Sequence, residues 1–426
     1  MFAALKKKIA DIVLDHRFLL ALYLLAAVGA AIQLLALGSA PFVMQKEIPG
    51  DIMLQHNLMV QFIGKQTTNY NNYLIFKYSF YHLLHGANLY ELYPDEHWDF
   101  FKYSPSFALL MAPLAWLPDY LGLPLWNVLN AAAVFIGVRM LPFGDRAKSF
   151  ILLFIFLELL TSLQNTQSNG LLCGLIIVAY GFMERGKIGW AALMLVLVTF
   201  IKVYGAIGFC LFLFFPQKGR AALYTLMWTA LLLLAPLLVT SADKLMWQYH
   251  NWKALLMADR AASLGISVMA WLTTWFHYTG SKALVTLAGV VLFLLQLTRV
   301  KLYQQQAYRE LMLASMLIWV IIFNHKAESP TYVIAVAGVA IWYFSRAATI
   351  WRTLLLWTVL VFTCLSATDL FPPVVKNSFL IPYTIKAVPC IMVWCVIWVE
   401  GLILLKAKAE SGTGGAASES SVGPQP

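Results

Sequence analysis

Apolar stretches about as long as a membrane-spanning helix follow one another along the chain, separated by short polar turns. A helix needs roughly 20 predominantly apolar residues to cross the hydrocarbon core of a bilayer. About a dozen such stretches account for most of the 426 residues. Only 12% of the residues are charged, against about 25% in an ordinary soluble domain. These features exclude a soluble enzyme, a nucleic-acid-binding module and a disulfide-rich scaffold, and they predict an all-α polytopic membrane protein.

The basic residues predict the orientation of the spans. They gather in short turns around residues 6–17, 139–148, 185–187, 218–220, 299–309, 346–352 and 406–408. Short loops rich in Lys and Arg stay in the cytoplasm. Assigning these turns to the cytoplasm predicts about 12 crossings, with both termini cytoplasmic. It requires Trp190–Phe215 to form two short arms that meet near Lys202 on the far side, and Pro105–Met140 to cross only once.

The chain divides into one membrane domain and a short tail. We predict a membrane domain over residues 1–409, with a first outer loop at about residues 39–103. The apolar run Phe18–Leu37 is long for a signal peptide, so we interpret it as an uncleaved first span. Residues 410–426 contain Gly, Ser, Ala and Pro without aromatic residues, and such a composition cannot form a packed core. They are predicted to be a disordered cytoplasmic tail.

With this orientation, carboxylates and aromatic residues concentrate in the first outer loop. The acids are Glu91, Asp95, Glu96 and Asp99, and they are interleaved with Tyr, Trp and Phe up to Tyr103. Upstream of them, apolar residues recur at helical spacing, which predicts an amphipathic helix over Asn72–His85 lying in the interface. Acids in an outer loop also occur simply as solvated surface, and that alternative stays open here.

Three further polar clusters fall on the same predicted face. An amide-rich turn, Gln164–Asn169, joins two spans, and a turn with four polar or ionisable residues covers Asn324–Glu328. Lys202, followed closely by Tyr204, lies in the middle of a long apolar stretch. An ammonium group at that depth is unfavourable unless it pairs or reaches water, so Lys202 is a candidate functional residue. The amide turn could equally serve only to close its hairpin.

Together these residue types suit the transfer of a sugar. Aromatic rings stack on sugar faces, and carboxylates bind sugar hydroxyls. A lysine at membrane level can neutralise a lipid-borne phosphate. A carboxylate can act as general base on an acceptor hydroxyl, while cations stabilise the departing phosphate. No metal site is predicted, because His82 and His85 share a helical face without a third ligand.

Several short motifs, taken in order along the chain, resemble glycosyltransferase family 87. They are Leu83–Tyr90, Tyr103–Leu110, Pro113–Pro118, Trp126–Asn130, Gln167–Gly170, Phe200–Tyr204 and, more loosely, Glu328–Tyr332. The resemblance implies the GT-C architecture, a multi-span bundle with a helical first outer loop. It also implies an enzyme that takes mannose or a related sugar from a polyprenyl phosphate on the outer face, without metal or cofactor.

The resemblance also implies roles for particular residues. Lys202 would contact the donor phosphate, helped by His325 or Lys326. The residues expected to line the cavity are Asn72, Tyr103, Gln167, Asn169 and Tyr204.

The chain departs from the family at the expected catalytic base. Spacing back from Leu83–Gly86 places Asn72 where the family usually has an aspartate, and an amide cannot accept the proton. The base is then one of Asp95, Glu96, Asp99 and Glu328; Asp99 and Asp95 are favoured because they adjoin the aromatic run.

The expected partners are a polyprenyl-phosphate sugar donor, a glycan or glycolipid acceptor and membrane lipids, in the inner membrane with the site facing the periplasm or the outside. A transporter or flippase of a lipid-linked saccharide is the alternative. It explains the apolar bulk and the buried lysine equally well, and Asn72 in place of an acid favours it. Against it, the cytoplasmic turns carry few acids or amides, which argues for chemistry on one side only.

Overall fold

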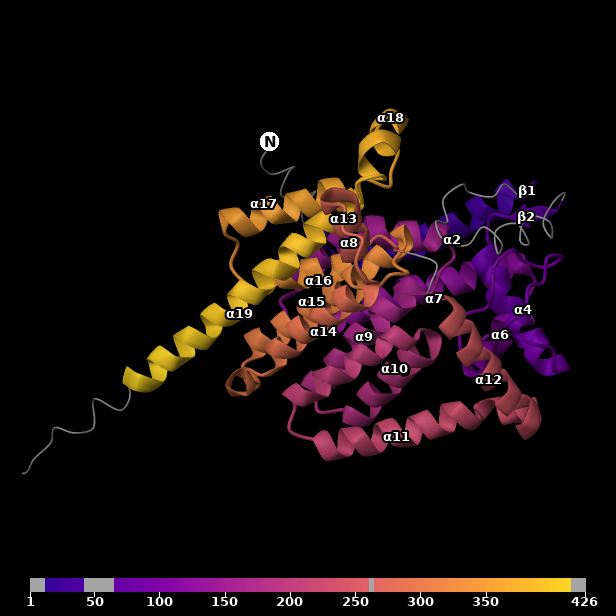
Figure 1. Ribbon diagram of the computed structural model, residues 1–426, viewed down its shortest axis with the longest axis horizontal. Helices are drawn as coiled ribbons and strands as arrows, with labels where there is room; N and C mark the ends of the chain where they lie inside the picture. The colour runs from indigo at the N-terminus through magenta and orange to yellow at the C-terminus, as the bar shows by residue number, and fades with distance from the viewer. Residues whose placement is uncertain (1–11, 42–64, 260–263, 415–426) are drawn as a thin grey trace, which may run out of the picture.

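The computed structural model describes residues 12–41, 65–259 and 264–414, and over these residues it is a helical bundle (Figure 1). One small antiparallel sheet accompanies the helices: β1 (Ser39–Pro41) pairs with β2 (Gln66–Thr68), with Ser39 opposite Thr68. The sequence prediction of a predominantly α-helical membrane protein is confirmed in this coarse form.

Five helices among the described residues are long and apolar enough to cross a membrane. They are α2 (His16–Leu37), α7 (Asp119–Met140), α8 (Asp145–Gln164), α11 with η2 (Lys218–Leu238) and the segment Ile385–Ile403 within η7 and α19. Six shorter apolar helices accompany them: α9 (Asn169–Glu184), α10 (Ile188–Ile201), η1 (Val203–Phe214), α14 (Lys282–Leu297), η4 with α16 (Ser329–Phe344) and α17 with η5 (Ile350–Cys364). The count of about 12 crossings remains a prediction.

The other elements are shorter or less apolar. They are α4 (Asn71–His85), α5 (Pro105–Leu110), α6 (Ala112–Ala115), α12 (Ala242–Asp259), α13 (Val268–Phe276), η3 (Val300–Leu302), α15 (Gln306–Ile322), α18 (Pro373–Val375) and η6 (Lys376–Leu380). The last long apolar segment comprises η7 (Ile385–Ala387) and the start of α19 (Val388–Gly414). α19 continues to Gly414, and residues 415–426 of the predicted tail lie outside the described residues.

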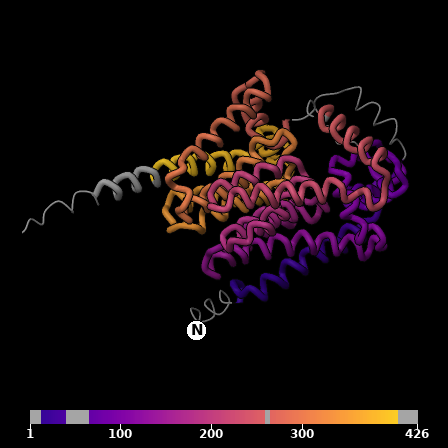
Figure 2. The backbone as a smooth tube through the Cα atoms, turned by 90° about the horizontal axis from the view of Figure 1, so that it is seen from below, coloured from indigo at the N-terminus to yellow at the C-terminus, as the bar shows by residue number. Residues whose placement is uncertain are grey.

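Two glycines let α7 and α9 pack against each other at close range. A Cβ on Gly174 of α9 would collide with the backbone of Ala133 in α7, and a Cβ on Gly137 would lie 2.8 Å from the Gly174 carbonyl oxygen. Small residues permit such approach between membrane helices, where packing drives association. α2 runs along one edge of the bundle beside α7 and α8 (Figure 2), and α11 lies next to α10 with few of its residues buried (Figure 1).

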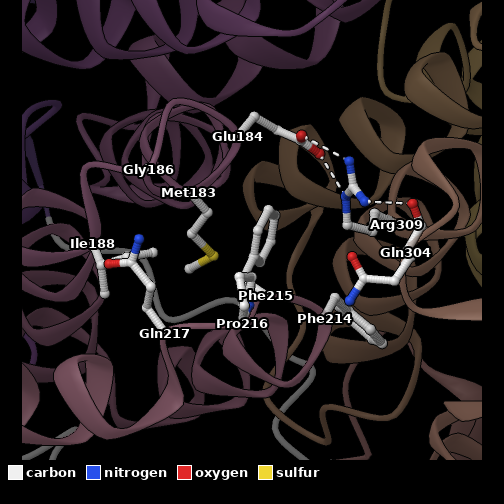
Figure 3. A pocket seen from close by; sticks show the side chains of 10 residues that line it. All are labelled: Met183, Glu184, Gly186, Ile188, Phe214, Phe215, Pro216, Gln217, Gln304 and Arg309. Carbon is white, nitrogen blue, oxygen red and sulfur yellow. Dashed lines mark hydrogen bonds and ion pairs between the residues drawn. The ribbon is translucent and has the colours of Figure 1, made fainter.

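The basic turns meet at one end of this bundle. The Arg185 guanidinium donates to the Met140 carbonyl at 2.8 Å, and Arg309 forms a two-pronged ion pair with Glu184 at 2.9 Å. A cavity of about 240 Å³ opens beside that ion pair (Figure 3). Three of the turns assigned to one side from charge alone, those around residues 139–148, 185–187 and 299–309, are thus neighbours in space.

The path of Pro105–Met140 agrees with a single crossing. Two short helices, α5 and α6, precede the 22-residue helix α7. The predicted helix at Asn72–His85 is also present as α4, with Phe76, Phe80 and Leu83 buried in the bundle. Leu84, expected on the same apolar face, is exposed instead.

Candidate active site

A hairpin of two helical arms holds Lys202 at its tip. α10 ends at Ile201 and η1 begins at Val203, so the predicted break at Lys202 is confirmed. The arms are antiparallel, because a Cβ on Gly205 would meet Val198. The 14 residues of α10 span about 21 Å at the α-helical rise, and the 12 residues of η1 span about 24 Å at the 3₁₀ rise. The tighter winding of η1 gives the shorter segment a matching reach.

Lys202 is half-buried and is held by an amide and two aromatic rings. Its Nζ donates to Asn169 Oδ1 at 2.9 Å. The same nitrogen lies 5.9 Å from the ring centroids of both Tyr103 and Tyr204, within range of cation–π attraction. The sequence expectation that this lysine must find partners is therefore met.

From Asn169 the contacts continue to a carboxylate on another helix. Asn169 Nδ2 donates to Gln167 Oε1 at 2.6 Å, and Gln167 Nε2 donates to Glu328 Oε2 at 2.8 Å. Glu328 immediately precedes η4 and is exposed, whereas Asn169 is fully buried. The Lys202–Glu328 chain, comprising Lys202, Asn169, Gln167 and Glu328, brings together four of the predicted site residues.

The turn between α8 and α9 presents Gln167 and Asn169 to this chain. Its central residue, Thr166, is fully buried and has φ 50°, an unfavourable angle for a β-branched residue. Contacts from two directions hold it there: Tyr73 N donates to its Oγ1 at 3.2 Å, and Trp126 Nε1 donates to its carbonyl at 2.9 Å. Strained backbone of this kind persists only where its surroundings enforce it, and it is often found at functional sites.

Aromatic packing places Tyr103 beside the lysine. The Phe76 ring of α4 meets the Tyr103 ring edge-on, with centroids 5.0 Å apart. The next residue, Ser104, donates from Oγ to the Phe200 carbonyl near the end of α10 at 2.6 Å. The hydroxyl of Tyr204, on the other side of Lys202, is buried without a hydrogen-bond partner among the described residues.

The four candidate acids lie in different environments. Of the four, Glu328 is the acid that accepts a hydrogen bond from Gln167. Asp95 is largely exposed and forms an ion pair with Lys65. Asp99 pairs with Lys102 at 3.1 Å. Burial raises the pKa of Tyr103, and the negative charges of Glu328 and Asp99 contribute in the same direction.

Glu96 belongs to another cluster. Its Oε2 lies 2.8 Å from His82 Nε2. Burial raises the pKa of the Glu96 carboxyl, and Asp95 raises it further.

Asn72 has a structural contact. Its Nδ2 donates to the Asn165 carbonyl at 2.9 Å, which ties the start of α4 to the turn after α8. His325 and Lys326 lie in the turn directly before Glu328, where Lys326 N donates to Asn324 Oδ1 at 2.9 Å. Their role at a donor phosphate stays a prediction.

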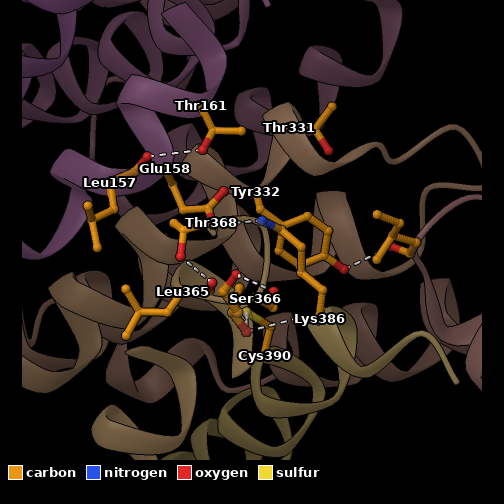
Figure 4. A network of polar contacts seen from close by, with 12 residues as sticks. Leu157, Glu158, Thr161, Thr331, Tyr332, Leu365, Ser366, Thr368, Lys386 and Cys390 are labelled. Carbon is orange, nitrogen blue, oxygen red and sulfur yellow. Dashed lines mark hydrogen bonds and ion pairs between the residues drawn. The ribbon is translucent and has the colours of Figure 1, made fainter. Parts of the chain in front are cut away.

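A buried ion pair was missed by the sequence analysis. Lys386 Nζ lies 2.7 Å from Glu158 Oε1, and both side chains are almost fully buried (Figure 4). The ammonium also lies 5.4 Å from the centre of the Tyr332 ring, four residues after Glu328. The pair thereby contacts the first residue of α16. The sequence did contain a signal for this pair, because Glu158 and Lys386 are each an ionisable residue inside an apolar run. The same argument identified Lys202 as a candidate.

The amino-acid sequence of this region also matches a known protein family. Residues 100–368 match the model of glycosyltransferase family 87, which covers more than half of the chain. The chain belongs to this family. The match includes every residue of the Lys202–Glu328 chain and begins after Asp95 and Asp99. A comparison with curated proteins gives no match. Family membership and the apolar helices together make the chain an integral membrane glycosyltransferase.

Proposed function

We propose that this family 87 glycosyltransferase moves a hexose, with mannose as the first sugar to test, from a polyprenyl phosphate to an acceptor hydroxyl on a glycan or glycolipid. One observation carries the proposal: a lysine at the tip of an apolar hairpin is joined through two amides to an exposed carboxylate. A cation for a lipid phosphate and a base for a hydroxyl thus occur in one site.

In this proposal Lys202 binds the donor phosphate. Arms of about 21 Å are shorter than the roughly 30 Å hydrocarbon core, so a hairpin that starts at the basic end holds Lys202 below the opposite surface. A polyprenyl phosphate carries its charge at the headgroup level, and the long lysine side chain can extend toward it from below. His325 and Lys326, in the turn beside Glu328, are proposed to assist, and Tyr103, Tyr204 and the two amides to line the sugar site.

Glu328 is the base we propose, in place of the family's usual aspartate. Its carboxylate removes the proton from the acceptor hydroxyl, and the oxygen attacks the sugar carbon. The bond from that carbon to the phosphate breaks, and polyprenyl phosphate leaves with its charge stabilised by Lys202. A single displacement inverts the sugar carbon. Asp99 is the second candidate, because its negative charge also raises the pKa of Tyr103.

The location we propose follows from the charged turns. The basic turns meet at one end of the bundle, and short basic loops stay in the cytoplasm. The Lys202–Glu328 chain lies at the other end, which then faces the periplasm or the outside of an inner membrane, with both termini cytoplasmic.

The alternative function is a transporter or flippase of a lipid-linked saccharide. The Glu158–Lys386 pair favours it, because ionisable groups inside apolar helices mark transport pathways in many membrane proteins. The two charges neutralise each other in a closed contact, however, and family membership favours transfer chemistry.

The deciding experiment uses purified protein in lipid nanodiscs with radiolabelled polyprenyl-phosphate mannose and a membrane lipid extract. We expect label to move into a new product with the wild type and to be lost with Lys202→Ala. Donor binding without product under every acceptor extract contradicts the proposal. In that case, movement of the labelled lipid across proteoliposome membranes tests the transporter directly.

A further inference from the structure

Three potential metal ligands converge outside the Lys202–Glu328 chain. His82, on the last turn of α4, meets Glu96 and His97 from the first outer loop. One ligand atom from each residue lies within 4.8 Å of the other two. From the sequence His82 had only His85 as a possible partner, but His85 is exposed and lies outside this group.

The three converging atoms are buried and lack hydrogen bonds. His82 Nε2, Glu96 Oε2 and His97 Nδ1 have no hydrogen-bond partner among the described residues, although Nε2 and Oε2 are 2.8 Å apart. The two histidines are 7% and 5% exposed. Leaving a buried polar atom unpaired costs about 1–3 kcal/mol. Three such atoms facing one another indicate that a shared partner satisfies them.

Backbone hydrogen bonds hold the segments that carry the three ligands. Gly86, with φ 71°, ends α4, and Ala87 N donates back to the His82 carbonyl at 2.8 Å. The chain then reverses over the helix end. Both Glu96 N and His97 N donate to the Tyr93 carbonyl at 2.9 Å, which fixes the two ligands relative to each other.

Outer contacts orient both imidazoles. The Tyr93 ring stacks on His82, with centroids 3.7 Å apart. The His97 ring lies beside the Tyr93 ring, with centroids 5.9 Å apart and the two planes at 61°. Burial lowers the pKa of both His82 and His97 to about 4, so both rings are neutral at pH 7, as metal ligation requires.

We propose that His82, Glu96 and His97 bind one Zn²⁺ ion. Two imidazole nitrogens and a carboxylate oxygen are a ligand set that zinc accepts, with a fourth position left for another oxygen. Ligands bonded to a tetrahedral zinc at about 2.0–2.2 Å lie on the order of 3.4 Å apart, so small side-chain adjustments close the site. The ion fastens the part of the outer loop that carries Glu96 and His97 to the last turn of α4.

The test is zinc binding, which does not depend on glycosyl transfer. Full-length protein in nanodiscs is stripped with a chelator, and Zn²⁺ alone is titrated against a chromophoric competitor. We expect one Zn²⁺ per chain. His82→Gln, Glu96→Gln and His97→Gln should each lower the affinity by more than about 100-fold, since losing even an outer partner of a metal ligand costs about 10–100-fold. His85→Gln, on the same helix turn, is the matched control and should bind like the wild type.

Two further measurements use the wild type and remain informative if a variant misfolds. Co²⁺ should give the visible absorption bands of a tetrahedral site, and Zn²⁺ should raise the thermal unfolding midpoint reversibly with chelator. The proposal is overturned if the wild type binds no more zinc than His82→Gln does. It is likewise overturned if neither the Co²⁺ spectrum nor the unfolding midpoint responds to metal; the cluster is then a histidine–glutamate contact alone.

Discussion

Lys202 and Glu328 lie at the two ends of one hydrogen-bonded chain, and every donor in it points toward the carboxylate. The ammonium donates to Asn169, Asn169 donates to Gln167, and Gln167 donates to Glu328. Hydrogen bonds aligned in one direction polarise one another. The arrangement therefore ends on an accepting carboxylate oxygen, and it couples the proposed phosphate-binding cation to the proposed base.

The first prediction concerns the base. Glu328→Gln keeps the shape of the side chain but removes its basicity, so kcat for sugar transfer should fall by about 10²–10⁴-fold. Asp95→Asn should leave kcat at the wild-type level, because Asp95 is largely exposed and pairs with Lys65. Steady-state transfer of labelled sugar measures both. The opposite pattern would move the base to the first outer loop.

The second prediction concerns the donor phosphate. Lys202→Ala should raise KM for the lipid donor by about 10- to 100-fold, since a hydrogen bond to a charged group contributes about 1.5–3 kcal/mol. Lys202→Arg keeps the charge and should lose less. Donor titrations of both variants measure the change, with Lys253→Ala, an exposed lysine on α12, as the control. An unaltered KM for Lys202→Ala would exclude ground-state phosphate binding at this position.

The third prediction concerns the Glu158–Lys386 pair. Lys386→Met leaves a buried carboxylate without its partner and should destabilise the protein by about 3–5 kcal/mol, whereas Glu158→Leu combined with Lys386→Met should recover most of that loss. Denaturant unfolding in mixed micelles provides the free energies. Lys376→Met is the matched control, because its partner Asp369 is fully exposed and such pairs contribute about 0–1 kcal/mol. Equal losses of unfolding free energy in Lys386→Met and Lys376→Met would show that the burial of the Glu158–Lys386 pair has no effect on its contribution to stability.

The fourth prediction concerns the contact between α7 and α9. Gly174→Ala introduces a methyl group against the Ala133 backbone and should lower the free energy of unfolding by about 1–3 kcal/mol. Gly29→Ala in α2 adds the same group where nothing lies within 4 Å, so stability should be unchanged or slightly higher. Thermal unfolding of the two variants side by side makes the comparison. Similar unfolding midpoints for the two variants would mean that α7 and α9 can move apart to admit the methyl group without a loss of stability.

Much of the fold could be predicted because the bilayer sets the length of each apolar run and because basic residues gather in the loops on one side. Apolar runs marked the long helices, and basic turns marked the segments that meet at one end. The break at Lys202 was also visible, because a single ammonium group interrupts an apolar run. Each of these signals depends on neighbouring residues alone.

The pairings within the site could not be predicted in the same way. Glu328 follows Gln167 by 161 positions, and Lys386 follows Glu158 by 228, so no local pattern reports either contact. Among the acids, aromatic neighbours favoured Asp99 and Asp95, whereas hydrogen bonding in three dimensions favours Glu328. For His82 the sequence spacing offered His85, but the turn at Gly86 brings His97 back instead.

The wide spacing of the Lys202–Glu328 chain along the polypeptide has a consequence for biosynthesis. Gln167, Asn169 and Lys202 enter the membrane with the first half of the protein, but their carboxylate partner is made more than a hundred residues later. Any fragment released before the helix that starts at Glu328 contains the proposed cation without the proposed base. The proposed site is consequently complete only after most of the chain has been synthesised, and a chain truncated before Glu328 lacks one end of it.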